Sequence, residues 1–107
     1  MTITSGEENE DLNTLNPSIY QTYIIGNETF QDRVYYTSLE DGGEMAIAYY
    51  THNMEWYIQP EQKRIDNIVG GLFKAENDST CPSDIGFIWQ YDDQGNWHEA
   101  GKGIVIH

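Results

Sequence analysis

Cysteine, proline and basic residues are scarce in this sequence of 107 residues, which contains one cysteine, three prolines and five lysine or arginine residues. Because Cys81 is the only cysteine, no internal disulfide can form and several thiolates cannot combine into a zinc site. The apolar runs are all much shorter than the roughly 20 residues that a membrane-spanning helix requires. We therefore expect neither a disulfide-stapled scaffold nor a cysteine-rich zinc domain, and no interaction with a membrane.

The few basic residues are outnumbered by 18 aspartate and glutamate residues, which gives a formal net charge of −13. A surface of this charge repels a phosphate backbone, so direct nucleic-acid binding is not expected. The charge is compatible with a cationic partner, with calcium, or with mimicry of the charge of a nucleic acid. Solubility alone is the simpler explanation, because acidic surfaces keep small proteins dispersed.

The sequence leaves the cellular compartment open. The first residues lack the basic start and apolar stretch of a signal peptide, and a lone cysteine is more typical of a reducing compartment, so an intracellular location is favoured. Against this, Asn27-Glu28-Thr29 and Asn77-Asp78-Ser79 both match the acceptor pattern for glycosylation. Such triplets arise often by chance in a chain rich in Asn, Ser and Thr.

Aromatic residues are abundant, with eight tyrosines, three tryptophans and three phenylalanines. A chain of this length and composition predicts one folded domain with a modest core. We expect residues 1–17 to form an acidic, disordered arm, because they combine four acidic residues with few apolar ones. Residues 18–107 are expected to form a single β-rich domain.

Short runs rich in Tyr, Ile, Val and Trp follow the arm, and turn residues separate them. This pattern predicts a mostly β fold: a small antiparallel meander closed as a barrel or a sandwich. The expected strands are residues 19–25, 33–38, 45–51, 55–59, 72–76, 87–91, 97–99 and 103–106. Pro60 and the spacing of Ile65, Ile68 and Val69 also indicate one short helix near residues 60–69, with a structured loop as the alternative.

Part of the chain resembles an aromatic-rich repeat unit of marine invertebrate and protist proteins. The segments that carry the resemblance are a Val-Tyr strand at Val34, an aromatic strand, Trp56-Tyr57-Ile58, Gly70-Gly71-Leu72, Cys81-Pro82-Ser83-Asp84-Ile85, Trp89-Gln90-Tyr91 and Trp97. The resemblance implies a β-rich, non-catalytic module. Residues 61–67 are longer here than in those units. A third possibility follows, that the chain is one unit of a longer repeat assembly.

Alternation along the strands indicates which side chains share a face. In the expected strands Trp56 and Trp89 point into the core as buried anchors. Tyr35, Tyr50 and Tyr57 fall on the opposite side of three consecutive strands, flanked by Arg33 and Gln59.

We predict that these three tyrosines form an exposed recognition surface, because flat rings bury area at a low entropic cost. The ligand would be a protein or a carbohydrate. The alternative is that the tyrosines form cross-strand pairs that only stabilise the sheet.

Motifs for catalysis and metal binding are largely missing. The sequence has no phosphate-binding loop, dinucleotide fingerprint, zinc-protease motif or nucleophile elbow. Cys81 with His52 or His98 could form a nucleophile and a base, but a cysteine before a proline in a polar loop is typically an inert thiol. The loops at residues 40–44 and 92–96 combine carboxylates with glycine, as calcium sites do, although acidic turns without metal are far commoner.

The sequence therefore predicts a protein that is not an enzyme and has no cofactor. The favoured function is a binding module that recognises a protein or a carbohydrate through the tyrosine surface. The alternative function is an acidic inhibitor or nucleic-acid mimic that occupies a basic site on a partner. The two differ in salt response, because a charge-driven complex weakens steeply as ionic strength rises.

Overall fold

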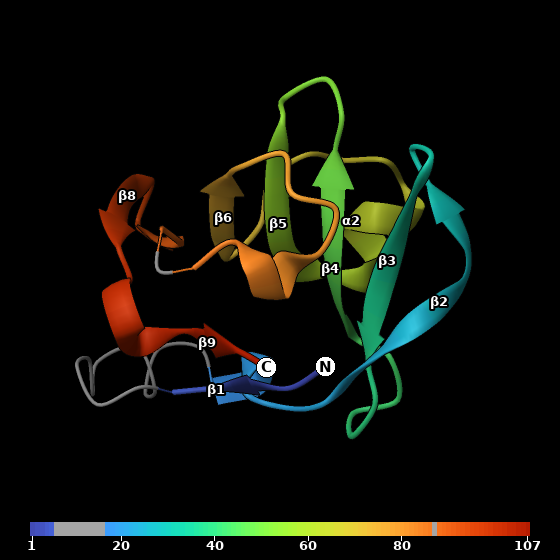
Figure 1. Cartoon of the computed structure of the whole chain (residues 1–107), viewed down its shortest axis with the longest axis horizontal. Helices are drawn as coiled ribbons and strands as arrows, with labels where there is room; N and C mark the ends of the chain where they lie inside the picture. The colour runs from blue at the N-terminus through green and yellow to red at the C-terminus, as the bar shows by residue number, and fades with distance from the viewer. Residues whose placement is uncertain (6–16, 87) are drawn as a thin grey trace.

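The computed structural model describes residues 1–5, 17–86 and 88–107. Seven strands that are consecutive in the sequence form one antiparallel sheet (Figure 1). They are β2 (Tyr23–Phe30), β3 (Arg33–Ser38), β4 (Met45–Tyr50), β5 (Glu55–Pro60), β6 (Phe73–Glu76), β7 (Gln90–Asp93) and β8 (Asn96–Glu99). Each strand pairs with the next one along the chain, because short turns return the chain beside itself.

A second, two-stranded sheet joins β1 (Ile3–Thr4) to β9 (Val105–Ile106). One short helix, α2 (Glu61–Ile65), follows β5, and three 3-10 helices complete the regular structure: η1 (Pro17–Ile19), η2 (Pro82–Asp84) and η3 (Gly101–Gly103). The mostly β class, the antiparallel meander and the short helix are thus confirmed. Among the described residues the hydrogen-bonded order ends at β2 and β8, so closure as a barrel or sandwich stays a prediction.

Turn residues explain where the hairpins form. The β7–β8 hairpin turns through Gln94 and Gly95, with φ angles of 53° and 89°, the backbone that a tight two-residue hairpin loop requires. Strand β2 runs further than expected, because a bulge between Ile25 and Thr29 lets it pair with β3 on both sides of Gly26. The strand was expected to end at residue 25, and it continues through the bulge to Phe30 instead.

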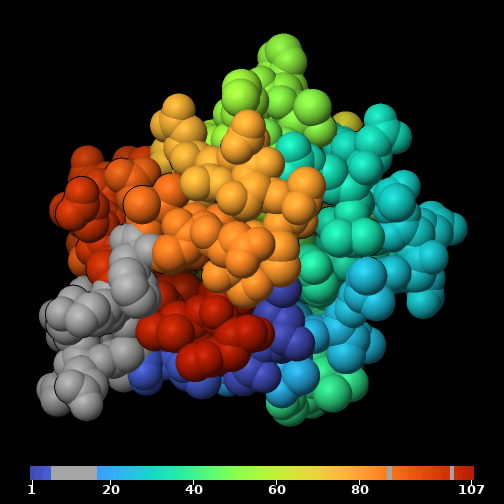
Figure 2. All heavy atoms as spheres, viewed as in Figure 1, coloured from blue at the N-terminus to red at the C-terminus, as the bar shows by residue number. Residues whose placement is uncertain are grey.

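The main hydrophobic core lies on the face of the sheet that Figure 1 turns to the viewer, which we call the front face. Trp56 and Trp89 are both fully buried there, as predicted. The segment that carries η2, shown in orange, packs across this face together with β1 and β9, and Figure 2 shows these segments forming the surface on this side. The Trp56 indole Nε1 donates a hydrogen bond to the Ser79 carbonyl oxygen at 2.9 Å, which ties the covering loop to the sheet.

The start of the predicted arm belongs to the fold, which corrects the expectation of disorder for residues 1–5. Ile3 is buried in the front core, and Ile3 and Thr4 pair with β9. The amide of Tyr23 also donates to the Met1 carbonyl oxygen at 2.6 Å. The sequence did not predict this strand, because the two apolar residues Met1 and Ile3 are too few to show a strand pattern. Residues 6–16 of the expected arm lie outside the described residues.

Candidate functional site

The three tyrosines of the predicted recognition surface do come together on the back of the sheet. The rings of Tyr50 and Tyr57 meet edge to face at 5.4 Å between centroids, and Phe30 packs against Tyr50 at 5.1 Å. Tyr35, Ala48, Tyr50 and Tyr57 form one buried group, which we call the tyrosine cluster. The parity argument therefore placed the three residues on the correct face.

The prediction that these rings are exposed is wrong. Tyr35, Tyr50 and Tyr57 are only 8%, 3% and 5% exposed. The cause is the segment of residues 61–71, which we call the strap: it contains α2, which lies behind β4 and β5 in Figure 1 and contacts both strands. All six residues of β4 are consequently buried, whereas the sequence had assigned only one face of that strand to the core.

Arg64 is the strap residue that lies directly over the cluster. Its guanidinium carbon is 3.9 Å from the centroid of the Tyr35 ring, and its Nε donates to Glu61 Oε1 at 2.6 Å. Gly26 approaches the same ring from β2, where an added Cβ would lie 2.2 Å from Cζ of Tyr35. Tyr35 is therefore held between a stacked cation and a backbone that has room only for glycine.

Gln59 and Arg33, predicted to flank the exposed tyrosines, have other roles. Gln59 is fully buried; its Nε2 donates to the Gly70 carbonyl oxygen at 2.6 Å, and its Oε1 lies 2.7 Å from the Tyr50 hydroxyl. Arg33 stacks over Tyr49, on the opposite face of the sheet, at 3.8 Å from the ring centroid. Gln59 thus fastens the strap from beneath, and Arg33 belongs to the front face.

The hydroxyl groups of Tyr50 and Tyr57 stay protonated at neutral pH. Burial raises the pKa of Tyr50, and burial together with the hydrogen bond to Glu55 raises the pKa of Tyr57. Both phenols are therefore neutral at that pH, and the Tyr57 hydroxyl donates to Glu55 Oε1 at 2.8 Å. The cross-strand ring contacts agree with the alternative stated above, that these tyrosines stabilise the sheet.

Three aliphatic side chains of the strap are exposed, and the sequence did not predict this feature. Ile65, Ile68 and Val69 are 58%, 49% and 44% exposed, and none of the side chains of α2 is buried. We call these three residues the strap patch. Their spacing indicated a short helix near residues 60–69, but periodicity cannot tell which side of a short segment faces the sheet. The available signal was Arg64 with Glu61, a paired cation that can cover an aromatic ring.

Three exposed acidic residues lie in the strap or beside residues that bond it. Glu44 adjoins the start of the strap, since its carbonyl oxygen accepts the Glu61 amide at 2.8 Å. Asp32 follows Gln31, whose Nε2 donates to Asn67 Oδ1 at 2.9 Å. Asp66 is exposed within the strap itself. We call Asp32, Glu44 and Asp66, all exposed, the acidic rim.

The two loops considered for calcium use their carboxylates to hold turns. Asp41 accepts hydrogen bonds from the Ser38 hydroxyl and from the amides of Gly43 and Glu44, both at 3.1 Å. Partial burial raises the pKa of Asp41, but these bonds and one from Gln21 outweigh it and hold the pKa below its usual value. In the second loop Asp92 Oδ1 accepts the Gly95 amide at 2.9 Å. No group of three or more His, Cys, Asp or Glu residues in the described part of the chain is arranged to hold a metal ion.

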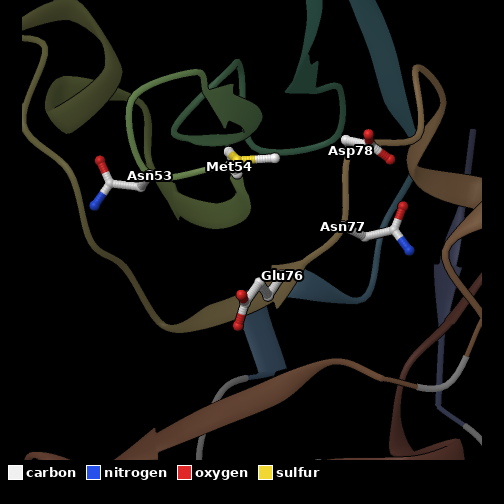
Figure 3. Close-up of a pocket in the computed structure, with 5 residues that line it drawn as sticks. All are labelled: Asn53, Met54, Glu76, Asn77 and Asp78. Atoms are coloured by element: carbon white, nitrogen blue, oxygen red, sulfur yellow. The ribbon is translucent and has the colours of Figure 1, made fainter.

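A shallow hollow of about 360 Å³ lies where the tip of the β4–β5 hairpin meets the chain after β6 (Figure 3). It is lined by Asn53, Met54, Glu76, Asn77 and Asp78. The Met54 side chain extends toward Asp78 across the hollow, and Asn77 Oδ1 accepts the Ser79 amide at 2.8 Å. The lining offers oxygen acceptors to a cationic group and contains no nucleophile beside a base.

The cysteine and histidines considered for catalysis make separate contacts. The Cys81 thiol lies 2.9 Å from the Ser83 hydroxyl, and His98 lies 3.9 Å from a carboxylate oxygen of Asp93. His52 lies in the exposed turn between β4 and β5. Among the described residues no helix has the length and apolar content needed to cross a membrane.

Comparison with known proteins gives no relative from which a function could be transferred. No family model matches the chain, and neither a curated protein nor a solved structure matches it.

Proposed function

We propose that this chain is a non-enzymatic interaction module that binds a protein through the strap patch. One observation carries the proposal: the strap presents a charged side chain, Arg64, to the sheet and three aliphatic side chains to the solvent. A surface segment of a small monomeric protein normally has the opposite arrangement. The resemblance to a non-catalytic repeat unit agrees with this proposal and stays an expectation.

The inverted arrangement has an energetic consequence. Burying an aliphatic side chain completely contributes about 1.5–3 kcal/mol. Since Ile65, Ile68 and Val69 are each about half exposed, covering them would add roughly 1 kcal/mol per side chain. A micromolar complex requires about 8 kcal/mol, so the patch supplies part of the affinity and the partner must make further contacts around it.

A protein partner fits this surface better than a carbohydrate. Sugar rings stack on exposed aromatic faces, and the tyrosines expected to provide such a face are buried. Aliphatic side chains at the centre of a surface with polar surroundings are typical of a protein–protein interface.

Differential capture tests the proposal. The full chain, the double variant Ile65→Ser/Ile68→Ser and the control Ile25→Ser/Ile88→Ser are immobilised and exposed to an extract of the source cells. The control is matched, because Ile25 and Ile88 are 59% and 48% exposed. Exposed substitutions change stability by about 0.5 kcal/mol or less, and circular dichroism checks that the fold is retained.

The expected result is at least one protein that the full chain and the control retain and the patch variant loses by about tenfold, the effect of removing a contact worth about 1.4 kcal/mol. Identical retained sets for all three chains would contradict the proposal.

The acidic surface favours a second candidate function, that of an inhibitor or nucleic-acid mimic occupying a basic site. Among the described acidic residues only Glu55 and Glu61 pair with a lysine or arginine side chain described in the structure, so most of the acidic charge has no paired cation there. Such a complex would dissociate at high salt and would be insensitive to Ile65→Ser/Ile68→Ser. A complex formed through the strap patch would keep most of its affinity at high salt.

A further inference from the structure

The charge around the strap patch indicates what kind of protein can cover it. The strap contains two acidic and two basic residues, so its own net charge is zero and the whole charge of −13 belongs to the rest of the chain. Arg64 is paired with Glu61 and stacked on Tyr35, and it offers little to a partner. Of the remaining strap charges, Asp66 belongs to the acidic rim and Lys63 is the single opposing cation.

The acidic rim approaches the patch from three elements. Asp66 follows α2 directly, Glu44 precedes β4 and adjoins the start of the strap, and Asp32 lies in the β2–β3 turn that is bonded to Asn67. A docked surface that covers the strap from its start to Asn67 therefore extends toward these exposed carboxylates. Like charges brought together at such an interface cost several kcal/mol, whereas opposite charges assist association.

Resting on the proposed function, we propose that the partner presents an apolar centre ringed by lysine or arginine side chains. The apolar centre covers Ile65, Ile68 and Val69, and the basic ring faces Asp32, Glu44 and Asp66. A second copy of this chain does not fit the same surface, because it would bring its own acidic rim and a further charge of −13. Residual repulsion from Lys63 is outweighed by three carboxylates.

Synthetic peptides provide the probe. The first is an amphipathic helical peptide with a leucine face bordered by lysines; the second has glutamate in place of each lysine; the third keeps the lysines and replaces each leucine by serine. Fluorescence anisotropy measures binding of each labelled peptide to the full chain at low and at physiological salt. Sedimentation of the chain alone measures self-association.

The leucine–lysine peptide is expected to bind at least about tenfold more tightly than either of the other two, since it alone has both an apolar face and complementary charge. Ile65→Ser/Ile68→Ser should weaken its binding by about tenfold, while the matched Ile25→Ser/Ile88→Ser should leave it unchanged.

A second variant tests the rim directly. Asp32→Asn/Glu44→Gln/Asp66→Asn should weaken binding of the leucine–lysine peptide and flatten its salt dependence. The control Asp78→Asn/Asp84→Asn/Glu99→Gln removes the same charge from other exposed positions, so it should have a much smaller effect, because charges beyond about 8–10 Å are largely screened.

The outcomes separate the two proposals. Equal binding of the lysine and glutamate peptides, or equal effects of the two charge variants, would overturn the basic ring while leaving the strap patch in place. Concentration-dependent dimers that Ile65→Ser/Ile68→Ser abolishes would also overturn it, in favour of a second copy. Unchanged peptide binding by Ile65→Ser/Ile68→Ser would overturn the proposed function itself.

Discussion

Replacing Tyr50 with phenylalanine should loosen the strap without disturbing the tyrosine cluster. The Tyr50 hydroxyl lies 2.7 Å from Gln59 Oε1 and 2.8 Å from the Ile68 carbonyl oxygen, so its single proton is shared between a buried amide and the strap. Phenylalanine keeps the edge-to-face contacts with Phe30 and Tyr57 and removes only this link.

The expected loss in the free energy of unfolding comes from a buried acceptor that the substitution leaves without a donor. In the Tyr50→Phe variant Gln59 Oε1 loses its partner inside the protein, and an unsatisfied buried acceptor costs about 1–3 kcal/mol. For a domain of about this size each kcal/mol lowers Tm by about 4–8 °C. The Ile68 carbonyl oxygen keeps a weaker bond, because Gln59 Nε2 still donates to it at 3.3 Å, so we expect the lower half of this range.

The adjacent Tyr49 provides a matched control. Tyr49 and Tyr50 are equally buried, at 3% exposure, and Tyr49 also meets an aromatic ring at 5.4 Å. Among the described residues the Tyr49 hydroxyl has no hydrogen-bond partner, so Tyr49→Phe leaves no buried acceptor unsatisfied and should cost less than Tyr50→Phe.

Urea denaturation gives the two free energies of unfolding. Hydrogen exchange at the Ile68 amide, which donates to the Lys63 carbonyl oxygen at 2.8 Å, reports the opening of the strap. Equal stability losses for the two variants, with no faster exchange at Ile68 in Tyr50→Phe, would refute the reasoning.

Three further predictions concern the core and the sheet. Trp56→Phe should cost roughly 1 kcal/mol more than Trp89→Phe in urea denaturation, because the Trp56 indole bonds a carbonyl oxygen, whereas Trp89 Nε1 is buried without a partner among the described residues; equal losses would contradict this. Gly26→Ala should destabilise by about 1–3 kcal/mol, since its methyl group would overlap the Tyr35 ring, and an unchanged Tm would show that the ring can move away. Burial, assisted by nearby carboxylates, raises the pKa of Tyr23 above the usual value of about 10. Only the unfolded chain ionises there at that pH, so stability should be complete below pH 10 and fall above it, and an absorbance titration in which Tyr23 ionises before the fold is lost would contradict the prediction.

Much of the sheet could be predicted because its signals are local. Short runs of apolar and aromatic residues marked β4 and β5, and turn residues such as Gly95 marked the hairpins. The ends of strands were less predictable, since a bulge at Gly26 extended β2 where a turn had been expected. The pairing of Ile3 with Ile106 could not be read from local pattern, because it joins residues from opposite ends of the chain.

For the tyrosine cluster, the sequence predicted which side chains share a face but not whether that face is exposed. Parity placed Tyr35, Tyr50 and Tyr57 on one face correctly, because alternation is fixed by strand geometry. Whether that face is open depends on where the following segment lies, and a five-residue helix carries too short a pattern to decide it. The buried Gln59 is the clearest example: a polar residue beside aromatics suggested a flank of an exposed surface, yet it bonds the segment that covers them.

The two sides of the strap therefore differ in their contacts: the inner side is bonded to the sheet, and the outer side exposes aliphatic side chains. Its inner side is fastened by Arg64 over Tyr35 and by Gln59 and Tyr50 beneath Ile68 and Gly70, contacts that stabilise the fold whether or not a partner is present. Its outer side, with Ile65 and the rest of the strap patch, contributes less to the isolated domain than buried side chains would, because each of these aliphatic side chains is only about half buried. A segment whose apolar side chains are not packed on the core has to be held by polar contacts, as the strap is. On the proposed function, the cation and amide on the inner side would hold the strap to the sheet while the aliphatic side chains on the outer side contact a partner.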